Sequence, residues 1–250
     1  MKLHFTRRHW NKLAKADPLW AVLTAPEKKG NRWQIEEFFA GGRATIADAI
    51  KEIQAHSELR LGSALDFGCG VGRLTQGLAQ HFAHVIGVDI SEEMLVHARR
   101  YNQHGERVSY AHNPQADLRL FASDQFDLVY SLITLQHMEP HYAKAYIAEF
   151  VRIAAKGGVI LFQIPSQPLS GKPDNSLLTH WPPTFFKRLR RRINRRLNVW
   201  LAYDPMMEMH AIPADEVRLL LESNGAEVLQ VARCHAAGDL ESWSYLARKR

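Results

Sequence analysis

The chain has 250 residues, 46% of them hydrophobic, and a formal net charge of +6. This length allows one sizeable α/β core, and no apolar run approaches the ~20 residues that a membrane-spanning helix needs. Two cysteines make neither a disulfide framework nor a metal-binding spacing, and the basic N-terminus lacks the apolar stretch of a secretory signal. We therefore expect a cytoplasmic protein without a metal centre.

Four segments of one domain follow each other along the chain. Residues 1–60 are predicted to be a helical cover rich in aromatic residues. In residues 61–164, short β-rich runs alternate with helical patterns, which predicts a doubly wound, mostly parallel sheet. The expected strands of this core are 63–67, 84–89, 107–111, 126–131 and 158–164.

Two helices of the core carry local signals. Leu74, Leu78 and Phe82 recur every four residues and predict one apolar stripe on the helix that follows the first strand. Ser91 is a plausible N-cap for the next helix, with two glutamates in its first turn.

Residues 165–212 interrupt the alternation and are predicted to be an insertion after the fifth strand, a usual place for substrate contacts. Residues 187–196, KRLRRRINRR, hold seven Lys or Arg and no acid, so the remaining chain is close to neutral. Apolar residues at helical spacing predict a basic amphipathic helix over residues 183–200. Three roles stay open for it: a helix packed on the domain, a helix on an anionic membrane surface, or a contact with nucleic acid. The last is disfavoured because no nucleic-acid-binding motif accompanies the helix.

The C-terminal segment, residues 213–250, is predicted to contain one helix and two strands. Pro213 can open the helix and Gly225 can end it as a left-handed cap. The strands 226–231 and 242–247 lie too close in sequence for a crossover helix, so they are expected to pair antiparallel.

The segment 64–76, ALDFGCGVGRLTQ, carries the main chemical signal. A dinucleotide-binding loop follows G-x-G-x-x-G/A, which would place Arg73 where close helix–strand packing requires a small residue. The pattern here is D-x-G-x-G-x-G. The carboxylate of Asp66, two residues before the first glycine, disfavours a pyrophosphate and favours a cationic ligand.

A second acidic residue indicates what that ligand is. Asp89 ends the second strand, nineteen residues after Gly70, where a carboxylate can accept hydrogen bonds from ribose hydroxyls. S-adenosyl-L-methionine combines an ammonium, a sulfonium and a ribose with no phosphate. The pair Asp66 and Asp89 therefore predicts this nucleoside as the cofactor.

These residues resemble the class I, Rossmann-like S-adenosylmethionine-dependent methyltransferases. Asp66–Gly72 matches the first motif of that family, Val85–Asp89 the second, and Phe126–Ser131 the strand facing the donor's methyl group. Residues 152–162 are similar to the turn before the family's fifth strand, with Ala155-Lys156 in place of Lys-Pro. The resemblance implies a seven-stranded sheet whose last strand is antiparallel, and methyl transfer to oxygen or nitrogen of a small molecule, such as a sugar or lipid-linked metabolite.

The resemblance also implies a set of cofactor-binding residues. Asp66 would hold the methionyl ammonium, Asp89 the ribose, and Ser131 and Leu132 would lie beside the sulfonium. The other candidates are glycines of the loop, residues around the adenine, and a glutamine that would orient the acceptor or the donor's carboxylate: Gly68, Gly70, Gly72, Ile90, Met94, Asn113, Asp117, Leu118 and Gln136.

His137 is the candidate general base, because imidazole is suited to proton transfer near neutral pH; the alternative is a histidine that caps a helix or packs against the donor. Arg43 would reach the donor's carboxylate or lie exposed on its helix. Trp33, Phe38 and Phe39 would cover the ligands or pack the cover onto the sheet. In the acceptor-side insertion, Trp181, Tyr203, Glu208, Met209 and His210 are further candidates for an acceptor pocket.

Two other functions stay open from the sequence. An NAD-dependent oxidoreductase would share the sheet and Asp89. A domain that binds the donor or nucleic acid without catalysis would also fit, because methyl transfer needs no obligatory side chain.

Overall fold

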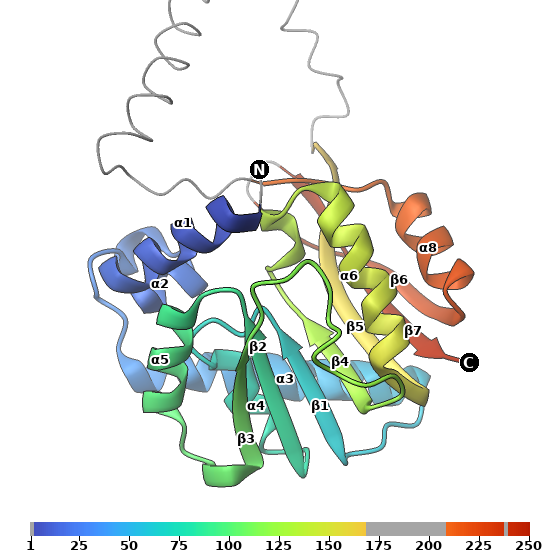
Figure 1. Ribbon diagram of the computed structural model, residues 1–250, viewed down its shortest axis with the longest axis horizontal. Helices are drawn as coiled ribbons and strands as arrows, with labels where there is room; N and C mark the ends of the chain where they lie inside the picture. The colour runs from blue at the N-terminus through green and yellow to red at the C-terminus, as the bar shows by residue number, and fades with distance from the viewer. Residues whose placement is uncertain (1–2, 169–208, 238–239) are drawn as a thin grey trace, which may run out of the picture.

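The computed structural model describes residues 3–168, 209–237 and 240–250, and these form one layered α/β unit (Figure 1). Its seven-stranded sheet has the order β3-β2-β1-β4-β5-β7-β6. Strands β1 to β5 are parallel, whereas β7 is antiparallel to both β5 and β6. The strands are β1 Ser63–Phe67, β2 His84–Asp89, β3 Val108–His112, β4 Phe126–Ser131, β5 Ala154–Pro168, β6 Ala226–Ala237 and β7 Leu240–Lys249.

The predicted fold class is confirmed, and the strand bounds agree closely. The first, second and fourth strands coincide with the predicted ranges, and β3 begins one residue later than expected. The largest difference is in β5, β6 and β7, which are all longer than predicted. β7 pairs with β5 on one side and with β6 on the other over most of its length, and these ladders extend the strands beyond their hydrophobic centres.

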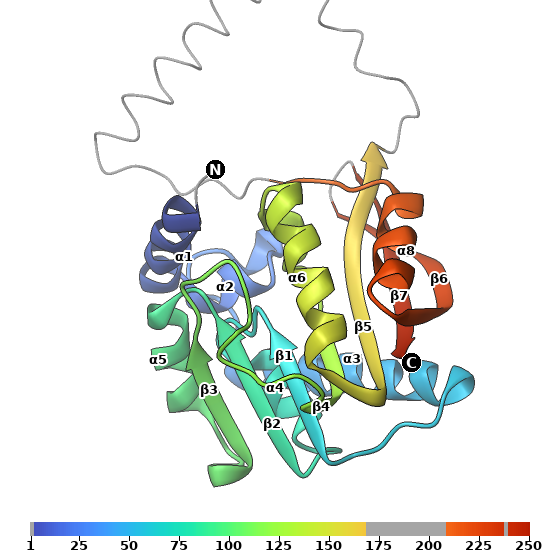
Figure 2. The same ribbon diagram turned by 45° about the vertical axis from the view of Figure 1, so that its right-hand side comes forward.

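Helices cover both faces of the sheet (Figures 1 and 2). Apolar side chains of α6 and α8 pack on one face, and those of α3 and α4 pack on the other. The α-helices are α1 Leu3–Ala16, α2 Pro18–Val22, α3 Ile35–His56, α4 Arg73–Leu78, α5 Glu92–Tyr101, α6 Pro140–Ile153 and α8 Ala214–Ser223. None of the helices in these described ranges is both long enough and apolar enough to cross a lipid bilayer.

The helix signals in the sequence are confirmed with one correction. Ser91 caps α5 by accepting a hydrogen bond from the amide of Met94, and Gly225 ends α8 with a φ of +92°. The helix after the first strand is shorter than predicted, because α4 ends at Leu78. The amide of Phe82 nevertheless donates to the carbonyl of Leu78 at 2.9 Å, which keeps Phe82 buried beside this helix.

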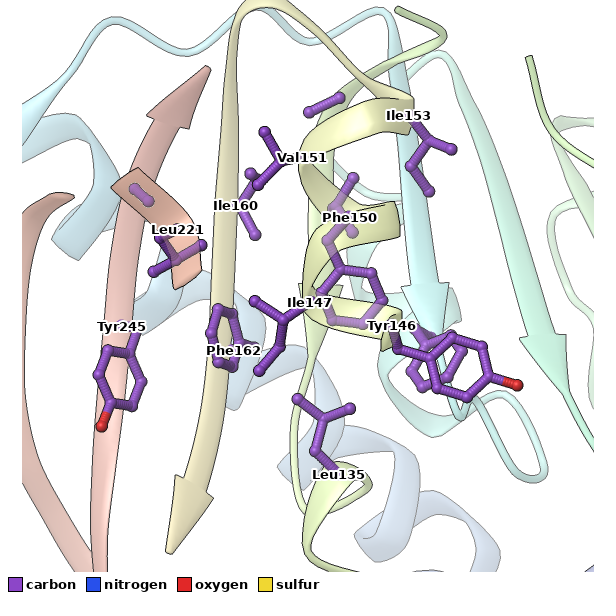
Figure 3. Close-up of a cluster of buried hydrophobic side chains, with 14 of the residues drawn as sticks. Leu135, Tyr146, Ile147, Phe150, Val151, Ile153, Ile160, Phe162, Leu221 and Tyr245 are labelled. Carbon is purple, nitrogen blue, oxygen red and sulfur yellow. The ribbon is translucent and has the colours of Figure 1, made fainter. Parts of the chain in front are cut away.

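The core beneath α6 fixes the central strands. Figure 3 shows Phe150 and Ile147 of α6 directed toward Phe162 of β5, with Tyr245 of β7 beside it. The rings of Phe162 and Tyr245 stack with centroids 5.2 Å apart. Aromatic side chains of this size contribute most of the apolar area buried in such a core. This packing holds β4, β5 and β7 together and so sets the position of the residues that follow β4.

The strand order places a ligand crevice between β1 and β4. From β1 the chain continues to β2 and β3 on one side and then returns to β4 on the other. In open α/β sheets, such a switch point leaves a crevice beyond the carboxyl ends of the two strands. Here α1 and α2 lie over this edge of the sheet (Figure 1). Of the helical cover predicted for residues 1–60, α1 and α2 therefore lie above the crevice, whereas α3 packs on a face of the sheet.

Contact between α3 and α4 depends on a glycine in the middle of a helix. A Cβ atom on Gly42 would lie 2.5 Å from the carbonyl oxygen of Arg73 and 2.8 Å from its Cγ. Glycine in a helix interior costs about 0.5–1 kcal/mol relative to alanine. The neighbouring Gly41 has no such constraint, because its nearest atom, Nη2 of Arg73, is 3.5 Å away.

We expect Gly42→Ala to lower the free energy of unfolding by about 1–3 kcal/mol, because backbone atoms of α4 must shift to make room. Gly41→Ala is the matched control in the same helix. It should raise stability by about 0.5–1 kcal/mol through helix propensity alone. Urea unfolding of both variants measures the difference, and equal effects would contradict the close approach of the two helices.

Candidate active site

A cavity of about 930 Å³ opens at the carboxyl ends of β1, β2 and β4. Its walls come from α1, the segment after α2, the glycine loop that follows β1, the end of β2, and the residues after β4. The cavity therefore occupies the switch-point crevice and is covered by the N-terminal helices. Within the described ranges, no group of three or more His, Cys, Asp or Glu side chains is arranged to hold a metal ion.

The structure brings most of the sequence-predicted site residues together. Ten of the fourteen line this one cavity: Asp66, Gly68, Gly70, Asp89, Ile90, Met94, Asn113, Leu132, Gln136 and His137. They come from four separate segments of the chain, and the sheet brings them to the same edge.

The other four predicted site residues, Gly72, Asp117, Leu118 and Ser131, do not line the cavity. Ser131 is buried, and its hydroxyl donates to the carbonyl of Phe67 at 3.0 Å. Leu118 is fully buried in the core beneath α6. Asp117 has its side chain engaged with Arg119 at the surface.

The glycines of the loop are explained by contacts with protein atoms. Added Cβ atoms would clash with Thr134 at Gly68, with Val22 at Gly70 and with Tyr110 at Gly72, all within 2.5 Å. All three glycines have positive φ angles between 53° and 83°. The missing side chain at Gly72 therefore allows close packing against Tyr110 of β3. At Gly68 it lets the residues after β4 lie close to the loop, and at Gly70 it does the same for α2.

Four backbone amides of this loop already donate hydrogen bonds to other atoms of the protein. Gly68 and Cys69 donate to the carbonyl of Val88 at 2.8 and 3.1 Å, and Gly72 donates to the carbonyl of Cys69 at 2.9 Å. The amide of Gly70 donates to Oδ2 of Asp89 at 2.9 Å. A pyrophosphate-binding loop needs such amides to point at the ligand. These four amides are already paired and do not form a phosphate cradle.

Asp89 connects the two strand ends that flank the cavity. Besides the bond from Gly70, its Oδ1 accepts a hydrogen bond from the amide of Ser91 at 2.7 Å. Burial raises the pKa of this carboxyl, while the two backbone donors oppose that rise. Each carboxylate oxygen retains a second lone pair, so Asp89 can still accept hydrogen bonds from hydroxyl groups of a ligand.

Asp66 is a buried carboxyl at the floor of the cavity. Its side chain is only 2% exposed and accepts a hydrogen bond from the hydroxyl of Thr75 at 2.6 Å. Burial, followed by the negative charge of Asp89, raises its pKa to about 7, although the hydroxyl of Thr75 and the charge of Arg73 act in the opposite direction. A cationic group bound beside Asp66 would favour the ionised carboxylate.

Gln136 and His137 form the polar part of the opposite wall. The Oε1 atom of Gln136 is buried without a hydrogen-bond partner, and its Nε2 lies 3.3 Å from Nε2 of His137. The His137 ring packs edge-on against Trp10 of α1, with ring centroids 5.3 Å apart. His137 therefore faces the cavity and also packs against the cover.

Several lining residues were not found by sequence reasoning. Trp10 belongs to the aromatic-rich cover but carries no signal of its own, and Arg73 differs in sequence only by being too large for a dinucleotide fingerprint. Thr134 and Gln163 carried no motif and reach the cavity because they follow β4 or lie on β5. Cover residues with no signal of their own are Leu3, Thr6, Ala21, Val22, Leu23 and Thr24.

Other sequence candidates lie away from the cavity or outside the described residues. Arg43 forms an ion pair with Glu36 at the surface of α3, and the cavity lining does not include it. Phe38, Phe39 and Trp33 pack the cover together in an apolar cluster with Val71 and Met94, and also do not line the cavity. Of the insertion candidates, Met209 lines the cavity and His210 donates its amide to the carbonyl of Gln136. The predicted basic helix 183–200 and the candidates Trp181, Tyr203 and Glu208 lie outside the described residues.

Comparison with known proteins agrees with this geometry. Residues 64–158 match a family described as a methyltransferase domain. The ubiquinone biosynthesis O-methyltransferase of Methylococcus capsulatus is 34% identical over 118 residues, which are 47% of this chain and 49% of that protein. The chloroplastic tocopherol O-methyltransferase of Arabidopsis thaliana is 36% identical over 110 residues, 42% of this chain and 30% of that protein. The chain thus spans half or less of the length of these relatives.

Among solved structures, the magnesium protoporphyrin IX methyltransferase of Synechocystis with bound S-adenosylhomocysteine superposes with a TM-score of 0.63. The alignment covers 99% of both chains at 18% identity. It shows the same fold for the described part of the chain, including the N-terminal helices. Together with the sheet order and the matched family model, it identifies residues 64–158 as a methyltransferase domain with the class I, Rossmann-like fold.

Proposed function

We propose that this protein transfers a methyl group from S-adenosylmethionine to an oxygen atom of a small-molecule acceptor. The observation that carries the proposal is the pairing of the glycine-loop amides with Val88, Cys69 and Asp89. This pairing leaves a carboxylate-lined crevice where a dinucleotide-binding protein presents free amides to phosphate. A nucleoside that is cationic and lacks phosphate fits this site.

Individual residues of the cavity match the parts of that nucleoside. Asp66 would hold the ammonium of the methionyl group, and Asp89 would accept hydrogen bonds from the ribose. Ile90 and Met94, which line the cavity after β2, would pack on the adenine, and Asn113 from the end of β3 is the candidate for its polar edge. Bound S-adenosylmethionine supplies an electrophilic methyl group, so this chain has to position and deprotonate the acceptor.

The cavity also has room for that acceptor. Ligand sites span about 300–1,000 Å³, and this one is near the upper limit. Beyond the polar pair Gln136 and His137, the wall is largely apolar. It includes Leu3, Trp10, Ile133, Met138 and Met209. Oxygen is favoured over nitrogen because the two sequence relatives described above are named as O-methyltransferases.

His137 is the side chain best placed to take a proton from an acceptor hydroxyl. Most of the acceleration of an in-line displacement can come from positioning, and a general base adds to it where the nucleophile holds its proton at neutral pH. The neighbouring Oε1 atom of Gln136, which is buried and has no hydrogen-bond partner among the described residues, can accept a hydrogen bond from a second donor group of the ligand, because the single proton of the reacting hydroxyl goes to His137.

The first test of the proposal compares ligands by thermal unfolding. We expect S-adenosylhomocysteine to raise the melting temperature in proportion to the logarithm of its concentration, while NAD leaves it unchanged. The reverse result would assign the chain to dinucleotide chemistry. Turnover of S-adenosylmethionine with phenols and carboxylic acids as acceptors then separates an enzyme from a domain that only binds the donor.

Donor binding should depend on pH through Asp66. Below its pKa of about 7 the carboxyl is neutral, so an ammonium must displace a proton to form the ion pair. The affinity for S-adenosylhomocysteine should therefore rise about tenfold from pH 6 to pH 8, following the ionised fraction of Asp66. Titration calorimetry measures this change, and Asp66→Asn should bind more weakly with a flatter pH profile. An unchanged slope in that variant would place the titrating group elsewhere.

The role of His137 is tested by separating turnover from binding. His137→Gln should lower kcat about 10²- to 10⁴-fold for a hydroxyl acceptor while the affinity for S-adenosylhomocysteine changes little. Trp10→Phe is the control for packing, because it alters the ring against His137 without removing the imidazole. Equal small losses in both variants would show that His137 only packs the cover.

A further inference from the structure

We infer that Arg73 binds the carboxylate of the donor's methionyl group and thereby selects nucleosides that carry an intact amino acid. This inference rests on the proposed function. Arg73 is the first residue of α4, immediately after the glycine loop, and it lines the same cavity as Asp66. It is only 7% exposed, which makes it an unusually buried cation.

The guanidinium of Arg73 lacks the partners that a buried cation needs. Its Nε atom is buried and has no hydrogen-bond partner among the residues that the structure describes. Nη2 donates to the hydroxyl of Thr45 at a long 3.3 Å, and the aromatic ring of Phe38 lies 5.7 Å from Cζ. Within the described ranges, no carboxylate forms an ion pair with it. Removing such a charge from water is costly unless it is paired.

A second arginine, Arg152, has a guanidinium whose donors are well supplied with hydrogen-bond acceptors from the protein. Arg152 of α6 makes two hydrogen bonds to the carboxylate of Glu149, and it also donates to the carbonyls of Leu118 and Phe121. Its side chain is 31% exposed, so it is less buried than Arg73 and has far more partners. The guanidinium of Arg73 therefore retains hydrogen-bond donors for a partner that the described residues do not supply.

The missing partner must be anionic and must lie close to Asp66. The charges of Asp66 and Arg73 interact, and the Arg73 charge lowers the pKa of Asp66. An α-amino acid presents an ammonium and a carboxylate on the same carbon atom, so its two partners must be neighbours of opposite charge. The carboxylate is the single anionic group of S-adenosylmethionine. Asp66 and Arg73, at the two ends of the glycine loop, provide this pair.

The packing of α3 supports the assignment. Gly42 lets this helix approach the backbone and Cγ of Arg73, and Phe38 and Thr45 of the same helix flank the guanidinium. Arg43, the arginine on α3 that sequence reasoning considered for this role, is paired with Glu36 away from the cavity. The close approach of α3 and α4 thus holds the Arg73 side chain between α3 and the cavity.

Calorimetry with three ligands tests this assignment: S-adenosylhomocysteine, its decarboxylated analogue, which keeps the amine, and 5′-methylthioadenosine, which lacks the amino acid. Arg73→Met should weaken S-adenosylhomocysteine about 10- to 100-fold, the range of a hydrogen bond to a charged group. The affinities for the other two ligands should change by less than about twofold. Arg43→Met is the matched control and should leave all three affinities unchanged.

The possible results separate the inferred role of Arg73 from the proposed function of the protein. A uniform loss across the three ligands, together with a lower melting temperature, would give Arg73 a structural role and overturn the inference. Unchanged binding of S-adenosylhomocysteine to Arg73→Met would also overturn it. If the wild-type protein itself ignores S-adenosylhomocysteine, the proposed function fails first. Arg73→Gln, whose amide retains a donor toward Thr45, gives the same ligand comparison should the methionine variant not fold.

Discussion

The site depends on the hydrogen bonds that the carboxylate of Asp89 accepts. Its two oxygens accept hydrogen bonds from the amides of Gly70 and Ser91, and these bonds tie the glycine loop after β1 to the end of β2. The loop then has no need of an external anion to satisfy Gly70. The amides of Gly68, Cys69 and Gly72 are also paired, with backbone carbonyls, so the loop offers no phosphate cradle. Dinucleotide-binding folds share an acidic residue at the position of Asp89, so the carboxylate that distinguishes this site is that of Asp66. The carboxylate of Asp89 keeps lone pairs for a sugar, so one side chain both orders the loop and faces the ligand.

Charge is distributed unevenly in the cavity. The donor end contains Asp66, Arg73 and Asp89, all substantially buried, whereas the wall toward α1 is mainly apolar with Gln136 and His137 at its edge. Buried charges are expensive in the absence of a ligand, and the raised pKa of Asp66 is one expression of that cost. In the binding mode that we infer, a zwitterionic amino acid would neutralise both Asp66 and Arg73. The site is thus most favourable when its donor is bound.

The N-terminal helices α1 and α2 contact both ends of this cavity. Val22 packs on Gly70 of the donor loop, and Trp10 packs on His137 of the acceptor wall. An apolar cluster that includes Phe38, Phe39 and Met94 holds α1 and α2 in place. Residues from the first quarter of the chain therefore cover a site whose charged residues Asp66, Asp89 and Arg73 lie on β1, β2 and α4. Because a closed site excludes water, it strengthens the electrostatic contacts within it.

The sequence alone determined the sheet, the glycine loop and the two acidic residues, because strand periodicity and short motifs depend on neighbours along the chain. It could not assign Gly72, Leu118 or Ser131 correctly to packing, since that depends on how far each side chain lies from the crevice. The contacts of Arg73 with Phe38 and Thr45 could not be predicted either, because both residues lie on a helix about thirty residues earlier in the chain. Tertiary structure decided which polar groups remain unpaired, since hydrogen bonds between distant segments are known only once the segments meet.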